Sequence, residues 1–399
     1  MGSSATLDVG TLCVDYSKNF LNDHTCLFVP SDRTTAGYDY VTDEGAPIVE
    51  EKDAYVAPLG DVLPRLEMMG ITVERLRREH EGSWPNFPFE ALAKAFRLCA
   101  IDAGSPSRSV WGDLDGAFAR EFESLLEAAI GQDALAPFRD ELSIVLEELD
   151  PLVVLRLLAE NPSNANVPVV WQFADVVEGG WAEPNAVHAT LPIRLQFLIV
   201  TEGSTDAHIL KKAFAMRRRR IADFFYFVDM TENYPFSGTG SLFNFSKGLG
   251  RIRIQNQVIV LYDNDTEGQT KLKATHDLGL PPNIRALALP SLKELEAFPT
   301  LGPGGRLATS INETAAAIEC YLDLGWAGKG EPMVRWTNYV AAADRYQGSL
   351  IGKDEHTKAF LALRDHEQDQ YDFSKLDLVL DTLISTAVAM AEAVSLDNL

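Results

Sequence analysis

The chain is poor in cysteine and has no long hydrophobic run. Its 399 residues include four cysteines, which are scattered and form no Cys-x-x-Cys pair. This argues against a structural zinc site and against a disulfide framework. The longest apolar stretch with little charge, residues 382–391, is too short to span a bilayer, and the N-terminus lacks the features of a secretory signal. We therefore expect a cytoplasmic protein that does not enter a membrane.

Basic residues are also in the minority. Lysine and arginine number 35 against 58 acids, which gives a net charge of −23. Such a charge argues against general coating of nucleic acid, although salt screening lets a local basic patch act on its own. The Gly-Lys-Ser/Thr signature of a P-loop is absent as well, so no ATPase of that kind is expected.

Four regions are expected in this α/β protein. The length favours two or three domains, and a hydrophobic content of 46% is typical of folded proteins. We predict an N-terminal β-rich and helical domain over residues 1–80, a mainly helical middle region over 81–190, a domain with a parallel sheet over 191–300, and a helical C-terminal region over 301–399.

Hydrophobic periodicity locates the expected elements. In the first half, the predicted strands cover residues 12–16, 26–29 and 38–41, and the predicted helices cover 61–76, 87–98, 114–129, 137–147 and 151–159. From residue 195 strands and helices alternate, as in βαβ units. These strands cover 195–200, 223–228, 257–262 and 284–289, and these helices cover 205–219, 242–248 and 268–278.

Acidic residues follow two of the predicted parallel strands. Glu202 and Gly203 come after the first, and Asp263, Asp265 and Glu267 come at every second position after the third. The carboxyl ends of parallel strands meet at one edge of a sheet, and Mg²⁺ prefers oxygen ligands. The pattern therefore predicts a site for Mg²⁺ or Mn²⁺. The alternative is a pair of ordinary acidic surface turns.

These motifs carry a family resemblance. Thr201-Glu202-Gly203-Ser204-Thr205-Asp206, followed by the acids of 263–267, resembles the Toprim domain of topoisomerases, bacterial primases and OLD-type nucleases, over about residues 195–290. The resemblance implies a Rossmann-like sheet. It also implies that Glu202 acts as general acid/base and completes the metal site, whose ligands are Asp263, Asp265 and Glu267. Asp206 is either an outer ligand or a charge that favours the helix N-terminus.

Further candidate residues follow the Toprim-like segment. OLD-type nucleases place additional acids and a lysine after this core. Positional similarity implies that Glu319, or alternatively Glu313, is a ligand of a second metal and that Lys353 is a catalytic charge stabiliser. We expect Glu319 on a helix over residues 315–322. The alternative is a surface glutamate and a loop lysine.

The N-terminal region carries a second resemblance. Gly2-Ser3-Ser4, Lys18-Asn19-Phe20 and the run from Leu66 to Thr72 resemble the N-terminal domain that accompanies HEPN or Toprim modules in bacterial proteins. That architecture implies a role in defence systems. Arg75 and His80 have the spacing of the HEPN ribonuclease motif Arg-x4-His, which also arises easily by chance in a basic helix.

Basic residues gather after the first parallel strand. Six of them occur within ten positions, namely Lys211, Lys212, Arg217, Arg218, Arg219 and Arg220. They predict a salt-dependent nucleic-acid contact or, alternatively, a solvated helix face. Residues 237–241 are rich in glycine and suggest a phosphate-binding turn or a plain tight turn. Aromatic residues are dispersed and indicate no base-stacking platform.

The combined pattern predicts a divalent-metal-dependent phosphodiester nuclease, acting on DNA rather than RNA, in bacterial antiphage defence. Two alternatives stay open. One is a nucleic-acid or nucleotide-binding sensor subunit that works with a defence-system partner protein, and the other is topoisomerase-like or primase-like phosphoryl transfer. The sequence leaves open whether the protein is a homo-oligomer.

Overall fold

The computed structural model describes residues 3–42, 45–83, 88–104, 148–228, 238–328 and 330–394, with a few residues between 123 and 146. It divides into two compact units. Unit 1 comprises Met1–Pro192 with Glu392–Leu399, and unit 2 comprises Ile193–Ala391. The helices predicted over 114–129 and 137–147 lie largely outside the described residues.

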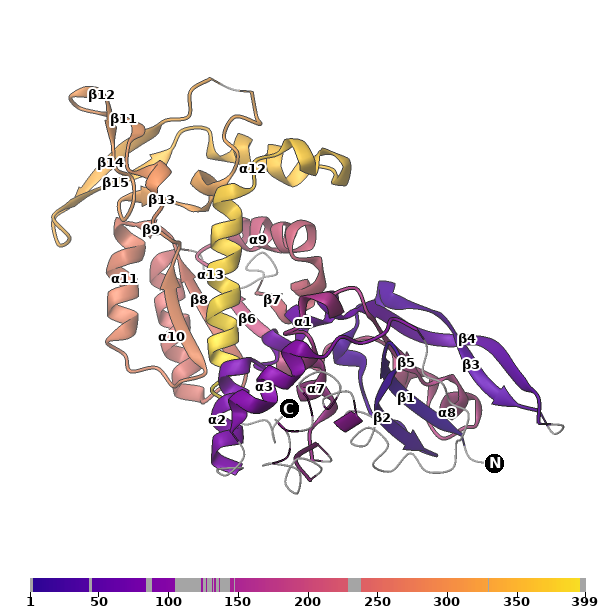
Figure 1. The fold of residues 1–399 in the computed structure, drawn as a ribbon. Coiled ribbons are helices and arrows are strands. Elements are labelled where there is room, and N and C mark those ends of the chain that lie inside the picture. Colours follow the sequence, from indigo (N-terminus) through magenta and orange to yellow (C-terminus); the bar gives the residue numbers. More distant parts are fainter. Residues whose placement is uncertain are drawn as a thin grey trace. The chain divides into compact units, whose positions relative to one another are not determined.

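Unit 1 is built on a five-stranded antiparallel sheet of order β2-β1-β5-β4-β3 (Figure 1). The strands are β1 Ser4–Val9, β2 Leu12–Lys18, β3 Arg33–Val41, β4 Pro47–Pro58 and β5 Pro168–Gln172. The helices are α1 Leu59–Met68, α2 Val73–Ser83, α3 Phe89–Leu98, α7 Pro151–Leu158 and α8 Ala174–Glu178. Phe28, Tyr55 and Trp171 stack in the core, with ring centroids 5.3–6.4 Å apart.

Two features expected in unit 1 can be compared with the structure: the strand over residues 26–29 and the motif formed by Arg75 and His80. The strand predicted over residues 26–29 is wrong, because Thr25–Leu27 form a 3-10 helix whose apolar side chains fill the core instead of pairing with a strand. Arg75 and His80 are both buried, Arg75 against Glu79 and His80 against Phe89. The structure therefore uses both side chains in packing.

Unit 2 contains a four-stranded parallel sheet of order β10-β8-β6-β7. Its strands are β6 Phe197–Val200, β7 Phe225–Phe227, β8 Gln257–Tyr262 and β10 Ile284–Ala288, and its helices are α9 Ser204–Arg217, α10 Thr239–Ile252 and α11 Thr266–His276. The predicted alternation of strands and helices is confirmed here. Leu242 and Leu249 of α10 pack against Val258 and Val260 on one face. On the other face Phe214 of α9 stacks on Phe225 at 4.1 Å.

The expectation that residues 301–399 are helical is wrong. This region holds α12 Lys353–Ala362 and α13 Ser374–Ala391, but also most of a second four-stranded sheet, of order β12-β11-β14-β15. The strands are β11 Phe298–Gly302, β12 Gly305–Thr309, β14 Val334–Val340 and β15 Arg345–Leu350. The alanines at 341–343, which favour a helix in isolation, form the turn between β14 and β15, because strand pairing overrides local propensity.

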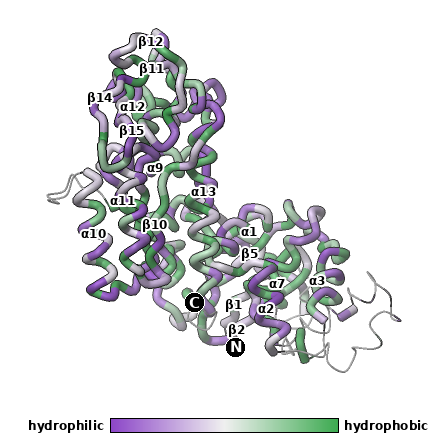
Figure 2. The backbone as a smooth tube through the Cα atoms, turned by 90° about the vertical axis from the view of Figure 1, so that its left-hand side faces the viewer, coloured by the Kyte–Doolittle hydropathy of each residue, from purple (hydrophilic) through white to green (hydrophobic). Residues whose placement is uncertain are grey.

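The helix predicted over residues 315–322 is wrong for the same reason. Ala315–Ala316 form strand β13, which pairs with β9 Asn264–Asp265, and Ile318–Tyr321 form a short 3-10 helix. Helix α13 shows both hydrophobic and hydrophilic segments in Figure 2, as expected for a helix with one buried face. Within the described residues no helix is long and apolar enough to cross a membrane.

Candidate metal centre

The structure brings the predicted acids together at the carboxyl edge of the parallel sheet. Strands β6 and β8 are parallel neighbours, with Val200 opposite Val260. Glu202 follows the first strand and Asp263 the second. The backbone N–H of Asp263 donates to Oε1 of Glu202 at 3.1 Å. We call Glu202, Asp206, Asp263, Asp265, Glu267 and Glu319 the acid cluster.

Asp263 lies at the electrostatic centre of the acid cluster. Burial raises its pKa well above the ordinary value, and the neighbouring carboxylates of Asp206, Glu202, Asp265 and Glu319 raise it further. With Asp206, Thr201 and Ile318 it is among the residues that line a narrow recess. A carboxylate among carboxylates is stabilised in its charged form when a cation joins the group.

Glu202 is held by donors from two elements. Its Oε2 accepts a hydrogen bond from the hydroxyl of Thr239, at the start of α10, at 2.7 Å. Burial raises the pKa of Glu202 to about 7; the bonds from Thr239 and from the Asp263 N–H oppose this rise, and the carboxylates of Asp265 and Glu267 add to it. A carboxyl group that titrates near neutral pH is suited to proton transfer.

Asp206 has two roles in the structure. Its Oδ2 accepts a hydrogen bond from the N–H of Gly203 at 3.0 Å, which caps the start of α9. Burial and the carboxylate of Glu319 raise its pKa to about 7, while the ammonium of Lys353 acts in the opposite direction. Glu319 is buried, with 4% of its surface exposed, and Lys353 is exposed at the first position of α12. Glu319 and Lys353 therefore both lie close enough to Asp206 to affect its pKa.

Both carboxylate oxygens of Asp265 accept hydrogen bonds from the protein. Its Oδ1 accepts a hydrogen bond from Gly268 N–H at 2.7 Å, at the start of α11, and Oδ2 accepts one from the side-chain amide of Gln347. The oxygen of the Gln347 amide accepts a bond from Glu267 N–H at 3.2 Å. The Glu267 side chain is exposed. Strand β15, which carries Gln347, thus holds the acidic loop from the side.

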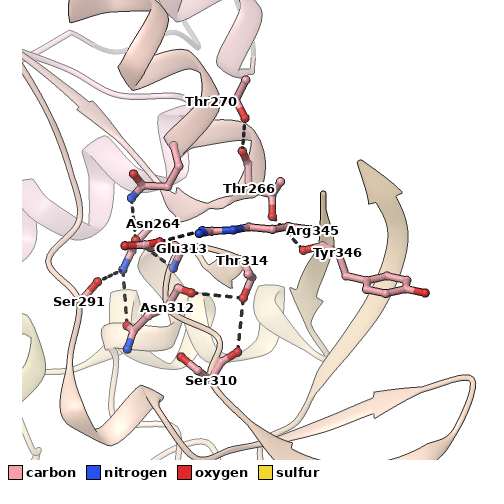
Figure 3. Close-up of polar contacts among 11 residues, drawn as sticks. Asn264, Thr266, Thr270, Ser291, Ser310, Asn312, Glu313, Thr314, Arg345 and Tyr346 are labelled. Carbon is pink, nitrogen blue, oxygen red and sulfur yellow. Dashed lines mark hydrogen bonds and ion pairs between the residues drawn. The ribbon is translucent and has the colours of Figure 1, made fainter. Parts of the chain in front are cut away.

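A polar network around Asn264 holds the segment between Asp263 and Asp265 in place (Figure 3). The fully buried Asn264 accepts bonds from Gln269 at 2.8 Å and from the N–H of Glu313 at 3.1 Å. The Glu313 carboxylate instead forms an exposed ion pair with Arg345 at 2.7 Å. Glu319, rather than Glu313, is therefore the acid that the fold places near Asp206 and Asp263.

The donor set suits a hard divalent cation in its chemistry. Several carboxylates share a confined site, and burial, together with neighbouring carboxylates, raises the pKa of Glu202 and of Asp206 to about 7. Within the described residues, however, no group of three or more acidic, histidine or cysteine side chains is arranged so that it could hold a metal ion. A cation would have to draw the carboxylates of Glu202 and Asp265 away from their protein donors.

Comparison with known proteins gives one family, in the N-terminal half. Residues 1–194 match the model of HEPN/Toprim N-terminal domain 1. The match supports a HEPN/Toprim-associated protein with a nuclease-related function. It ends close to Pro192, where unit 1 gives way to unit 2. No curated protein matches the chain. No solved structure matches it either.

The basic residues predicted to contact nucleic acid already have protein partners in several cases. Arg217 pairs with Asp377 at 2.8 Å, and Arg218 pairs with Asp377 and Asp381. The ammonium of Lys212 donates to the backbone oxygens of residues 361 and 363. Arg219 approaches Asp365 at 3.9 Å, and Lys211 is exposed. These contacts tie α9 to α12 and α13, while nucleic-acid binding by the six residues stays a prediction.

Sequence reasoning missed three residues that position the acid cluster. Thr239 bonds to Glu202, Asn264 organises the acidic loop, and Gln347 holds Asp265. Asn264 stands inside the motif and could have been noted as a buried polar residue. Gln347 is 82 positions away from Asp265 and lies in a segment that was expected to be helical. The packing of β15 beside β13 and α11 brings it to the site.

Proposed function

We propose that unit 2 is a Toprim-type nuclease domain that binds Mg²⁺ or Mn²⁺ and hydrolyses phosphodiester bonds in nucleic acid, DNA in preference to RNA, in bacterial antiphage defence. The observation that carries this proposal is the convergence of Glu202 and Asp263 from adjacent parallel strands, with Asp206 and Glu319 beside them. The HEPN/Toprim N-terminal match supports the nuclease-related part.

In this proposal Asp263, Asp265 and Glu267 would hold the cation and Glu202 would complete its site. Asp206 would be an outer ligand, and Glu319 is the candidate ligand of a second cation. When bound, such a cation polarises the scissile phosphate and lowers the pKa of an attacking water. Glu202 accepts a proton near neutral pH, and Thr239 orients its carboxylate. Lys353, close enough to Asp206 to affect its titration, supplies positive charge to the phosphate.

A second candidate function rests on the bonds that already occupy Glu202 and Asp265. Their oxygens accept hydrogen bonds from Thr239, Gly268 and Gln347, which favours a domain that binds nucleic acid or a nucleotide and signals to a defence partner. This candidate predicts binding without bond cleavage.

A cleavage assay separates the two functions. Supercoiled, linear and single-stranded DNA and RNA are each incubated with the full chain and Mg²⁺ or Mn²⁺, beside Glu202→Gln and Asp263→Asn. The nuclease proposal predicts cleavage by the wild type, a loss of at least about 100-fold in both variants, and faster cleavage of DNA than of RNA. Cleavage that persists in Asp263→Asn would contradict the metal assignment. Binding without cleavage under every condition would favour the sensor.

A further inference from the structure

Helix α10 presents one continuous polar face to solvent. The exposed residues on this face are Gly240, Asn244, Lys247, Gly248 and Arg251. Their spacings of three and four residues place them on one side of the helix, while the opposite side packs on the parallel sheet. We call these five residues the α10 stripe.

The α10 stripe is basic within an acidic chain. Residues 239–262 contain three bases and no acid, although 58 of the 399 residues are acidic. Neither Lys247 nor Arg251 forms an ion pair with any of the described residues. By contrast, ion pairs with α13 already compensate the charges of Arg217 and Arg218. The cations of the α10 stripe are therefore available to a ligand.

A third base extends this surface onto the neighbouring helix. Helices α10 and α11 pack side by side (Figure 1). The ammonium of Lys271 on α11 lies 5.2 Å from the centre of the Phe243 ring on α10. In the part of the chain that the structure describes, Lys271 pairs with no carboxylate. The cation-π contact therefore holds Lys271 beside α10 without neutralising its charge.

The glycines of the α10 stripe have no packing role within the described structure. A Cβ at Gly240 or Gly248 would meet nothing within 4 Å, whereas one at Gly250 would come within 2.9 Å of the Leu280 side chain. Glycine inside a helix makes the helix less stable than alanine does. Packing therefore explains Gly250 but not Gly248. The absence of a side chain at Gly248 lets a ligand approach the helix backbone closely.

The α10 stripe begins beside the candidate metal centre. Thr239, the first residue of α10, donates its hydroxyl to Glu202 at 2.7 Å. A rise of about 1.5 Å per residue places Lys247 about 12 Å and Arg251 about 18 Å from Thr239 along the helix axis. Both distances exceed the screening length of about 10 Å at 0.1 M salt, so salt screens these cations from the acid cluster.

We infer that the α10 stripe, together with Lys271, binds the phosphate backbone of duplex DNA and directs it toward the acid cluster. Lysine, arginine and asparagine side chains are common donors to phosphate oxygens. A protein partner would need an apolar or aromatic centre in the contact, and the α10 stripe offers only glycine, amide and charged groups. Its length of about 18 Å matches roughly five base pairs. The inference deepens the proposed nuclease function and rests on it for the direction of the DNA.

The test measures binding separately from cleavage. Fluorescence anisotropy in EDTA follows two labelled DNA duplexes of unrelated sequence with the full chain, between about 50 and 200 mM salt. Lys247→Gln with Arg251→Gln should weaken the binding of both duplexes about 10-fold or more at the lower salt concentration. The same change should reduce the slope of log affinity against log salt by about 2, because two phosphate contacts are lost.

Two further variants make the test specific. Arg306→Gln with Arg335→Gln, which removes two exposed cations from the other sheet of unit 2, should leave affinity and slope unchanged. Gly248→Gln should weaken DNA binding by about 5-fold or more, although it should raise the melting temperature by about 2 °C because glutamine favours a helix. A purely structural role for Gly248 would not separate these two effects. Circular dichroism checks that each variant is folded.

Three results would overturn the inference. The first is a wild type that binds neither duplex, or a Lys247→Gln, Arg251→Gln variant that keeps the affinity of the wild type. The second is an equal loss in the Arg306→Gln, Arg335→Gln variant, which would mean that net charge alone governs binding. The third is a loss with one duplex sequence only. Because no step requires cleavage, failed binding leaves the nuclease proposal standing, and failed cleavage leaves the α10 stripe standing.

Discussion

Asp263 illustrates how a single carboxylate can be unfavourable for the fold and useful for binding a cation. Burial and the charges of Asp206 and Glu202 disfavour the charged form of Asp263. Asp263→Asn removes that charge at nearly constant volume. We expect the metal-free variant at pH 7.5 to gain about 1 kcal/mol or more in its free energy of unfolding, measured by urea denaturation. Glu331→Gln, which changes an exposed acid of unit 2, should leave the free energy unchanged. A loss of stability in Asp263→Asn would show that its charge is compensated within the protein.

The pKa values of Glu202 and Asp206 make a second prediction at this scale. Both are raised to about 7, above the ordinary values of 4.5 and 3.8. Between pH 5 and 7 the folded protein therefore holds protons that the unfolded chain has released. Its free energy of unfolding must then fall as pH rises through this window, by roughly 1–3 kcal/mol in metal-free protein. Glu202→Gln should make the free energy of unfolding decrease less between pH 5 and 7. A free energy of unfolding that rises from pH 5 to 7 in metal-free protein would contradict these assignments.

Elements show where sequence reasoning succeeds and where it fails. The parallel strands β6 and β8 are almost entirely apolar, and the sequence predicts each within a few residues because a strand buried on both faces is composed mainly of apolar residues. Strand β14 is rich in β-branched and aromatic residues, which favour a strand, but β15 mixes arginine, glutamine, glycine and serine, and alanines join the two strands. Their hairpin is local, but the contact of Gln347 with Asp265 joins residues 82 positions apart, and no local pattern in the sequence indicates it.

The turn into α11 yields a prediction at the scale of the element. A Cβ at Gly268 would lie 2.2 Å from the backbone oxygen of Asp263, whereas one at Gly248, inside α10, would meet nothing within 4 Å. Gly268→Ala should therefore destabilise the protein by about 2 kcal/mol or more, because the acidic loop must shift. Gly248→Ala should stabilise it by roughly 0.5–1 kcal/mol, because alanine favours the helix. Thermal denaturation of both variants tests the pair, and equal effects would contradict the close packing of the loop.

At the scale of the whole molecule, the residues that match a known family and the residues of the candidate metal centre lie in different units. The HEPN/Toprim N-terminal match covers residues 1–194, and every member of the acid cluster lies within Ile193–Ala391. We therefore expect a fragment of residues 193–391 to fold alone and to retain divalent-cation binding. A cooperative unfolding transition and a Mn²⁺ titration of the fragment check this. A fragment that folds but no longer binds Mn²⁺ would mean that unit 1 contributes to the site.

The central claim is that the acid cluster binds a divalent cation, and Mn²⁺ titration of the full chain at pH 7.5, followed by electron paramagnetic resonance, tests it most directly. We predict saturable binding by the wild type, at least about 10-fold weaker binding by Asp263→Asn, and unchanged binding by Glu331→Gln. Equal Mn²⁺ affinity in the wild type and in Asp263→Asn would contradict the account.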